Sequence, residues 1–142
     1  MDTSKAVENY IKICEFLLAN ASTAPVGTHM NINLQRHVGH YVTVEIEHRP
    51  NRKAYLRVFD CPNSSGHSPQ NYFYAGYDLK KIRATIYKDR PTLDLMKNLV
   101  IGWHRYGIKE IILNAFNEAV AEAVAEANEK LEAEKEIDNF VV

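Results

Sequence analysis

The sequence predicts an α+β fold with an N-terminal helix, an antiparallel sheet of four to five strands and two C-terminal helices, the last one long. Apolar residues recur at helical spacing at both ends of the chain and alternate with polar residues in the middle. Residues 108–137 contain neither Gly nor Pro. The 142 residues suit one domain. Residues 1–107 would form its body and residues 108–137 a helix that serves oligomerisation.

The first predicted helix begins with a capping residue, Asp2, Thr3 or Ser4, and ends near Asn20. Residues at helical spacing give it one apolar face: Val7, Tyr10, Ile11, Cys14, Leu17, Leu18 and Ala21. We expect this face to pack on the body. Because Cys14 lies within the face, it is predicted to be a buried structural thiol.

Three stretches between His29 and Phe59 alternate between apolar and polar residues and are predicted to be strands. The first strand begins at His29, and the second lies within His40–His48. The turn Arg49-Pro-Asn-Arg52 then leads into the third strand. The second and third strands form a hairpin with a core face (Val42, Val44, Ile46, Ala54, Leu56 and Val58) and an opposite face that includes Tyr55, Arg57 and Phe59.

The second half of the chain continues with a loop over residues 61–70 and a β-prone stretch, Asn71–Tyr77. Leu79–Lys88 is predicted to be a further strand because it alternates and contains β-branched residues, with a helix as the alternative. Pro91 suits the first turn of the next helix, which Gly107 closes. Gly102 inside this helix suggests close packing.

The last helix carries apolar residues in steps of four, with a stripe of alanines beside them. About 30 helical residues extend roughly 45 Å, whereas a compact domain of this size is less than about 40 Å across. The helix should therefore outrun the body. Its apolar stripe predicts a homo-oligomer, although the spacing does not establish a regular heptad repeat. A solvated helix extension is the alternative.

Charge is divided unevenly along the chain. The net charge is −1, but residues 108–142 hold nine acidic residues and three lysines, which leaves +5 for residues 1–107. Neither a signal-peptide pattern nor an apolar run of membrane-spanning length is present. Two isolated cysteines favour a reducing compartment. We therefore expect a cytoplasmic protein that does not interact with membranes.

The sheet face opposite the core is the main candidate for function. Aromatic rings stack on bases and basic side chains pair with phosphate, so an aromatic and basic face predicts a non-enzymatic protein that binds a small anionic ligand such as a nucleotide. The predicted ligand-binding residues are Tyr55, Arg57, Phe59, Lys81, Arg83 and Tyr87, with Arg105 near the helix junction. The structural alternative is that Glu45 or Glu47 pairs with Arg57 across strands.

Other chemistry has weaker support in the sequence. His37 and His40 have a His-x-x-His spacing, with His29, His48 and Cys61 nearby, but no complete zinc motif is present. A hydrolase using His67 or this pair is a minor alternative. We assign no catalytic residue, metal or cofactor.

The main rival from another functional class is a protein interaction module, for instance a small virus-encoded inhibitor of a host protein complex. It would act through the acidic edge of the last helix, formed by Glu118, Glu122, Glu126 and Glu129.

Overall fold

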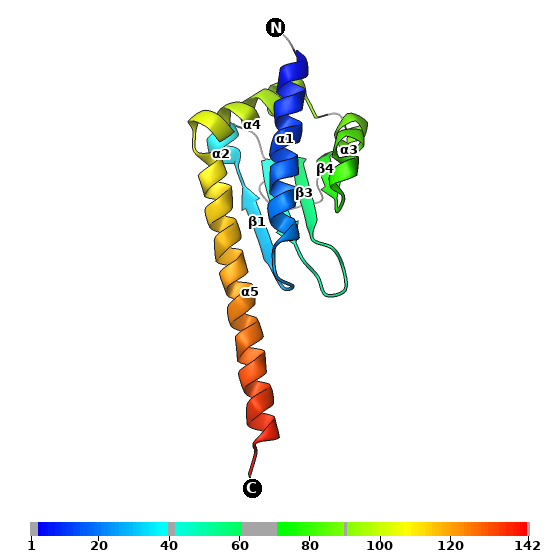
Figure 1. Cartoon of the computed structure of the whole chain (residues 1–142). Helices are drawn as coiled ribbons and strands as arrows, with labels where there is room; N and C mark the ends of the chain where they lie inside the picture. The colour runs from blue at the N-terminus through cyan, green and yellow to red at the C-terminus, as the bar shows by residue number, and fades with distance from the viewer. Residues whose placement is uncertain (1–2, 40–41, 61–70, 90, 142) are drawn as a thin grey trace.

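The computed structural model of the protein describes residues 3–39, 42–60, 71–89 and 91–141, and it is α+β as predicted. Helices cover one face of a four-stranded antiparallel sheet, and one long helix extends away from the body (Figure 1). The elements in chain order are α1 (Thr3–Ser22), β1 (His29–Asn33), α2 (Gln35–Val38), β2 (Val42–Glu47), β3 (Tyr55–Asp60), β4 (Asn71–Gly76), the 3₁₀ turn η1 (Leu79–Lys81), α3 (Ile82–Asp89), α4 (Leu93–Arg105) and α5 (Ile108–Asp138).

The sheet is a simple meander in which each strand pairs with the next along the chain. Val44 of β2 lies opposite Ile32 of β1 and Val58 of β3. The antiparallel pairing of β2 with β3 confirms the hairpin, and the alternate residues that were predicted to face the core all belong to the hydrophobic core, which confirms their facing. A bulge at Val58/Phe59 shifts the register between β3 and β4.

The inner face of the sheet is covered by α1 and α5, which lie along β3 and β1, while α3 packs against β4 (Figure 1). The predicted apolar face of α1 is buried, and Cys14 within it is fully buried. Burial raises the pKa of the Cys14 thiol to about 12. Cys14 is therefore a structural thiol that stays protonated at neutral pH.

The prediction of a strand over Leu79–Lys88 is wrong, because these residues form η1 and α3. Asp78 starts the turn by accepting a hydrogen bond from the Lys80 amide at 2.8 Å. Ile82 and Ile86 are then buried on one side of α3. A spacing of four residues suits a helix as well as a strand, so this pattern could not separate the two. The short helix α2 was not predicted.

Capping residues set where α4 begins and where it ends. At its start, Thr92 caps α4 by accepting a hydrogen bond from the Leu95 amide at 3.3 Å, so Pro91 precedes the helix instead of lying in its first turn. Gly107 separates the two helices in the left-handed conformation, with φ of +69°. Gly102 does pack closely, since a Cβ there would lie 3.2 Å from Val38 Cγ1.

The long helix α5 is anchored by its first half only. Its buried residues are Ile108, Ile112, Phe116, Ala119 and Ala123. Four residues turn the helix about 40° more than one full turn, so residues spaced by four drift around the helix. The step of three from Phe116 to Ala119 brings the buried stripe back to the face that packs on the body. Every described side chain from Val124 to Val141 is exposed. This projecting part of α5, residues 124–138, is about 22 Å long.

None of the helices in the described part of the chain combines the length and apolar character that crossing a membrane requires.

Candidate anion-binding pocket

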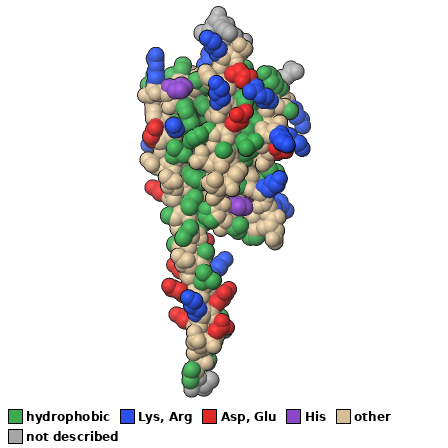
Figure 2. Space-filling model, viewed as in Figure 1, with side chains coloured by type: hydrophobic (Ala, Val, Ile, Leu, Met, Phe, Trp, Pro, Cys, Tyr) green, Lys and Arg blue, Asp and Glu red, His purple; other side chains and the backbone are tan. Residues whose placement is uncertain are grey.

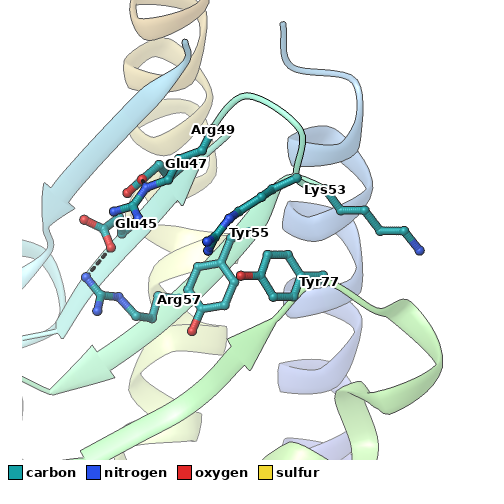
Figure 3. A pocket seen from close by; sticks show the side chains of 8 residues that line it. Glu45, Glu47, Arg49, Lys53, Tyr55, Arg57 and Tyr77 are labelled. Carbon is teal, nitrogen blue, oxygen red and sulfur yellow. Dashed lines mark hydrogen bonds and ion pairs between the residues drawn. The ribbon is translucent and has the colours of Figure 1, made fainter. Parts of the chain in front are cut away.

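A pocket lies on the outer face of the sheet, beside the turn between β2 and β3 (Figure 3). It encloses about 500 Å³, part of it open to solvent. Four basic side chains, two carboxylates and two tyrosines line it: Arg49, Arg52, Lys53, Arg57, Glu45, Glu47, Tyr55 and Tyr77. The lining therefore has a net charge of +2 and two aromatic rings.

Strand alternation and register place the floor of this pocket. Glu45 of β2 pairs in register with Arg57 of β3, and Glu47 pairs with Tyr55. Because alternate residues of a strand share a face, all four side chains lie on the side opposite the core. Tyr77 follows β4, and its ring lies 4.8 Å from that of Tyr55. The two rings form an aromatic wall.

Glu45 is the most heavily bonded group of the site. Its carboxylate accepts hydrogen bonds from Arg57 and from Asn31 Nδ2, the latter at 3.2 Å, and lies 3.1 Å from His29 Nε2. Burial alone would raise the pKa of Glu45, but the His29 bond, the Arg57 charge and the Asn31 bond together outweigh it and lower the pKa. Glu45 is therefore a buried anion at neutral pH.

Arg57 is held from two sides. Its guanidinium pairs with Glu45 and lies over the rings of Phe59 and Tyr72, at 4.9 Å and 5.8 Å from their centroids. Its charge is thus largely compensated by the protein itself. Arg57 therefore acts mainly as a fixed, partly buried part of the pocket wall, and its charge is not free to bind a ligand.

The uncompensated charge lies at the rim. Arg49 pairs with Glu47, whereas Arg52 and Lys53 make no ion pair with any residue that the structure describes. Both are exposed; Arg52 is the last residue of the turn and Lys53 follows it. His48 stabilises this turn, with its Nε2 3.0 Å from the Arg52 carbonyl and its Nδ1 2.6 Å from the Ala24 carbonyl. The pocket therefore has a stabilised rim with two free cations.

The same region contains a set of potential metal ligands. His29, Glu45 and Glu47 each offer one ligand atom, and these atoms lie within 4.8 Å of one another. Three such ligands could hold zinc with an open position. However, each carboxylate is already paired with a guanidinium, and the positive charges of Arg49 and Arg57 oppose a divalent cation. The charge of the site suits an anion better.

The structure brings together only some of the predicted site residues. Tyr55 and Arg57 line the pocket, and Phe59 lies beneath the Arg57 guanidinium. Lys81, Arg83 and Tyr87 were expected on the same sheet face, but they lie on η1 and α3, outside the pocket.

Two of the remaining positions are engaged elsewhere. Arg83 pairs with Glu8 of α1, with its Nη2 3.0 Å from Oε2. Arg105 is the last residue of α4 and is exposed, also outside the pocket. Of the predicted cross-strand pairs, the one between Glu45 and Arg57 is confirmed.

Several pocket residues were missed at the sequence level. The alternation placed Glu45 and Glu47 on the outer face, but Arg52 and Lys53 looked like ordinary turn residues, and Tyr77 came from a stretch of uncertain facing. Three basic residues within Arg49–Lys53 were the signal that could have indicated a charged rim. His40, Cys61 and His67 lie outside the described residues, while His37 is exposed on α2.

In comparisons with known proteins, no family model, curated protein or solved structure matches the chain.

Proposed function

We propose that this protein is a non-enzymatic binding protein whose pocket beside the β2–β3 turn takes a small anionic ligand such as a nucleotide. The observation that carries the proposal is the pairing of free cations at the rim, Arg52 and Lys53, with the Tyr55–Tyr77 wall. Phosphate pairs with the cations, and a planar ring stacks on the wall. A nucleotide combines both features in one molecule.

The carboxylates of the pocket do not oppose this ligand. Glu45 and Glu47 are neutralised by Arg57 and Arg49, and they position those guanidiniums. The excess charge of +2 is thereby left to Arg52 and Lys53, which are exposed and free to close over phosphate. A hydroxyl group of the ligand can donate a hydrogen bond to Glu47, because carboxylates accept hydrogen bonds from hydroxyls.

The test is titration calorimetry of the purified protein with ADP, AMP, adenosine and inorganic phosphate. We expect ADP to bind most tightly, since it offers both a ring and two phosphates. Arg52→Ala combined with Lys53→Ala should weaken ADP binding about tenfold or more, because each charge-assisted hydrogen bond contributes about 1.5–3 kcal/mol. Tyr77→Ala should weaken ADP and adenosine binding alike.

The matched control for charge is Arg83→Ala, which removes a cation that is paired with Glu8 outside the pocket. The matched control for the aromatic wall is Tyr87→Ala, an exposed tyrosine of α3. Both controls should bind ADP as the wild-type protein does. Equal affinity of the wild-type protein and the Arg52/Lys53 double variant, or no binding of any probe, would contradict the proposal.

A second candidate function is interaction with another protein through the acidic edge of α5. The observation that favours it is that Glu118, Glu122, Glu126 and Glu129 are all exposed on one side of this helix. Reversing these four charges to lysine should abolish binding to a basic partner and leave ADP binding unchanged. Loss of ADP affinity in this variant would show that the two surfaces are not separate.

A further inference from the structure

The helix α5 carries a second apolar stripe, of which the body covers only the first part. Leu113, Val120, Val124 and Leu131 follow one another in steps of seven, four and seven. They lie about 100° around the helix axis from the stripe that packs on the body. Leu113 and Val120 are half-buried, Val120 against the core, whereas Val124 is 46% exposed and Leu131 is 55% exposed. Exposed large apolar groups in a continuous line mark an interaction surface.

The residues between these four complete a heptad pattern. Leu113, Asn117, Val120, Val124, Ala127, Leu131, Glu134 and Asp138 are separated by alternating steps of four and three. We call these eight positions the seam. Alternating steps of four and three keep one line of residues facing a partner helix. The seam runs over 26 residues, about 39 Å of helix.

We propose that the seam pairs with the α5 seam of a second copy of this chain, in antiparallel orientation. The proposal is independent of the pocket. A second copy fits because apolar positions occupy the middle of the seam and the polar ones, Asn117, Glu134 and Asp138, lie nearer its two ends. Reversing one helix against the other therefore sets the apolar residues in the middle of the seam, from Val120 to Leu131, against one another.

Charge excludes the parallel orientation. In a parallel pair, Glu134 and Asp138 would each face the same residue of the second copy, so like charges would meet in the seam. Lys130 would also face Lys135 across the flank, which is the contact that sets orientation in coiled coils. Antiparallel pairing separates all these like charges.

The proposed antiparallel register matches the middle of the seam. It sets Val120 opposite Leu131 of the second copy and Val124 opposite Ala127, while Asn117 lies opposite Glu134 and Leu113 opposite Asp138 at the two ends. A shift by one heptad in one direction sets Glu134 opposite Glu110, and a shift in the other sets Val124 opposite Glu134. The first alternative brings two like charges together, and the second sets Glu134 and Asp138 against the central residues Val124 and Val120, where a carboxylate is costly to bury.

The overall charge distribution supports the same arrangement. Residues 124–138 contain six acidic residues and two lysines, a net charge of −4, whereas residues 1–107 carry +5. Figure 2 shows acidic side chains on both flanks of the projecting helix and basic side chains gathered over the body. Antiparallel pairing lays each acidic projection beside the basic body of the other copy, so the charges attract.

The end of the projecting part also gains a partner in this register. Phe140 is 75% exposed just after α5, and it would reach the start of the α5 helix of the second copy. A surface groove lies there, lined by apolar groups of Ile13, Phe16 and Trp103 with Lys12 and Lys109. Lys109 lies one turn before Leu113 on the same side of α5. The groove is therefore beside the seam, where Phe140 can enter it.

The first test is the molar mass in solution, measured by sedimentation equilibrium over a range of concentrations. The wild-type chain should be a dimer, and Val124→Glu combined with Leu131→Glu should be a monomer with an unchanged helix content. Ala125→Glu combined with Ala133→Glu adds the same charge on exposed positions away from the seam and should remain a dimer. A monomeric wild-type chain, or a dimeric Val124/Leu131 variant, overturns the proposal.

The second test is cysteine cross-linking in a Cys61→Ser background, since Cys14 is buried. A mixture of chains with Val120→Cys and chains with Leu131→Cys should form a disulfide-linked dimer under oxidation. Chains with Leu131→Cys alone should not, because the two copies of residue 131 lie about 17 Å apart, well beyond disulfide reach. Efficient cross-linking of Leu131→Cys chains with one another shows parallel pairing and overturns the orientation.

Discussion

At the scale of single residues, Glu45 organises the pocket. It is a carboxylate on a strand face that the alternation of β2 places away from the core, yet only 7% of it is exposed. Contacts from β1 and β3 surround it: His29 and Asn31 on one side and Arg57 on the other. Because these contacts compensate its charge, Glu45 can hold Arg57 in place without a large cost of burial.

Replacing Glu45 by Gln tests this role through pH. The pKa of Glu45 in the folded protein lies below its ordinary value of 4.5, so the folded state binds protons less readily than the unfolded state. The stabilisation is therefore complete above the ordinary pKa and is lost as the pH falls through the lowered one. We expect Glu45→Gln to reduce the free energy of unfolding by about 1–3 kcal/mol at neutral pH.

Urea unfolding of the two proteins, at neutral pH and again at about pH 4, measures this difference. The gap between wild type and Glu45→Gln should narrow at the lower pH. Glu47→Gln is the control, since its partner Arg49 is mostly exposed and the pair contributes less than about 1 kcal/mol. A gap that widens on acidification would contradict the lowered pKa of Glu45.

At the scale of elements, the sequence correctly predicted the segments in which the spacing of apolar residues fits either a helix or a strand but not both. The hairpin of β2 and β3 alternates over its whole length, and α5 has more residues than any strand. The sequence failed at α3, where Ile82 and Ile86 fit both periods and the β-branched residues favoured a strand. A helix is favoured there because the side chain of Asp78 caps the preceding 3₁₀ turn and because α3 packs against β4.

Only those residues of the candidate site that lie on correctly predicted strands could be identified from the sequence. Tyr55 and Arg57 were identified because their facing followed from the β3 pattern. Arg52, Lys53 and Tyr77 belong to turns and strand ends, where position in space depends on how the chain bends. Sequence periodicity carries no such information, and Lys81 and Arg83 were assigned to the site through the wrong element.

The two halves of α5 should respond differently to truncation of a large side chain. Phe116 is buried against the body, so Phe116→Ala should reduce the free energy of unfolding by about 3–5 kcal/mol. Leu131 is exposed on the projecting part of α5, and Leu131→Ala should change monomer stability by less than about 0.5 kcal/mol. Both are measured by denaturant unfolding at concentrations where the chain is monomeric. A comparable loss at Leu131 would mean that the projection folds back on the body.

At the scale of the whole molecule, the basic body and the acidic projection make the chain strongly dipolar although its net charge is only −1. In the antiparallel dimer, each end of this dipole meets the opposite end of the other copy. Long-range attraction of this kind acts through water and is screened by salt.

Salt should therefore weaken the association. We expect the dissociation constant of the dimer to rise severalfold between about 0.05 M and 0.5 M NaCl, because the Debye length falls well below the distances between the body and the projection. Sedimentation equilibrium at several salt concentrations measures the effect. An association that strengthens with salt would indicate that apolar contact alone drives dimerisation, without the predicted attraction between body and projection.

The uninterrupted backbone of α5 also fixes the phase between its two stripes. The seam begins in the anchored half and continues into the projection, so the two parts of the seam stay in line only while the number of residues between them is unchanged. Inserting or removing one residue near Glu122 would rotate the later part of the seam by about 100° from the earlier part and leave each half chemically unchanged. Helical phase is thus a structural parameter of this molecule, separate from the identity of any single side chain.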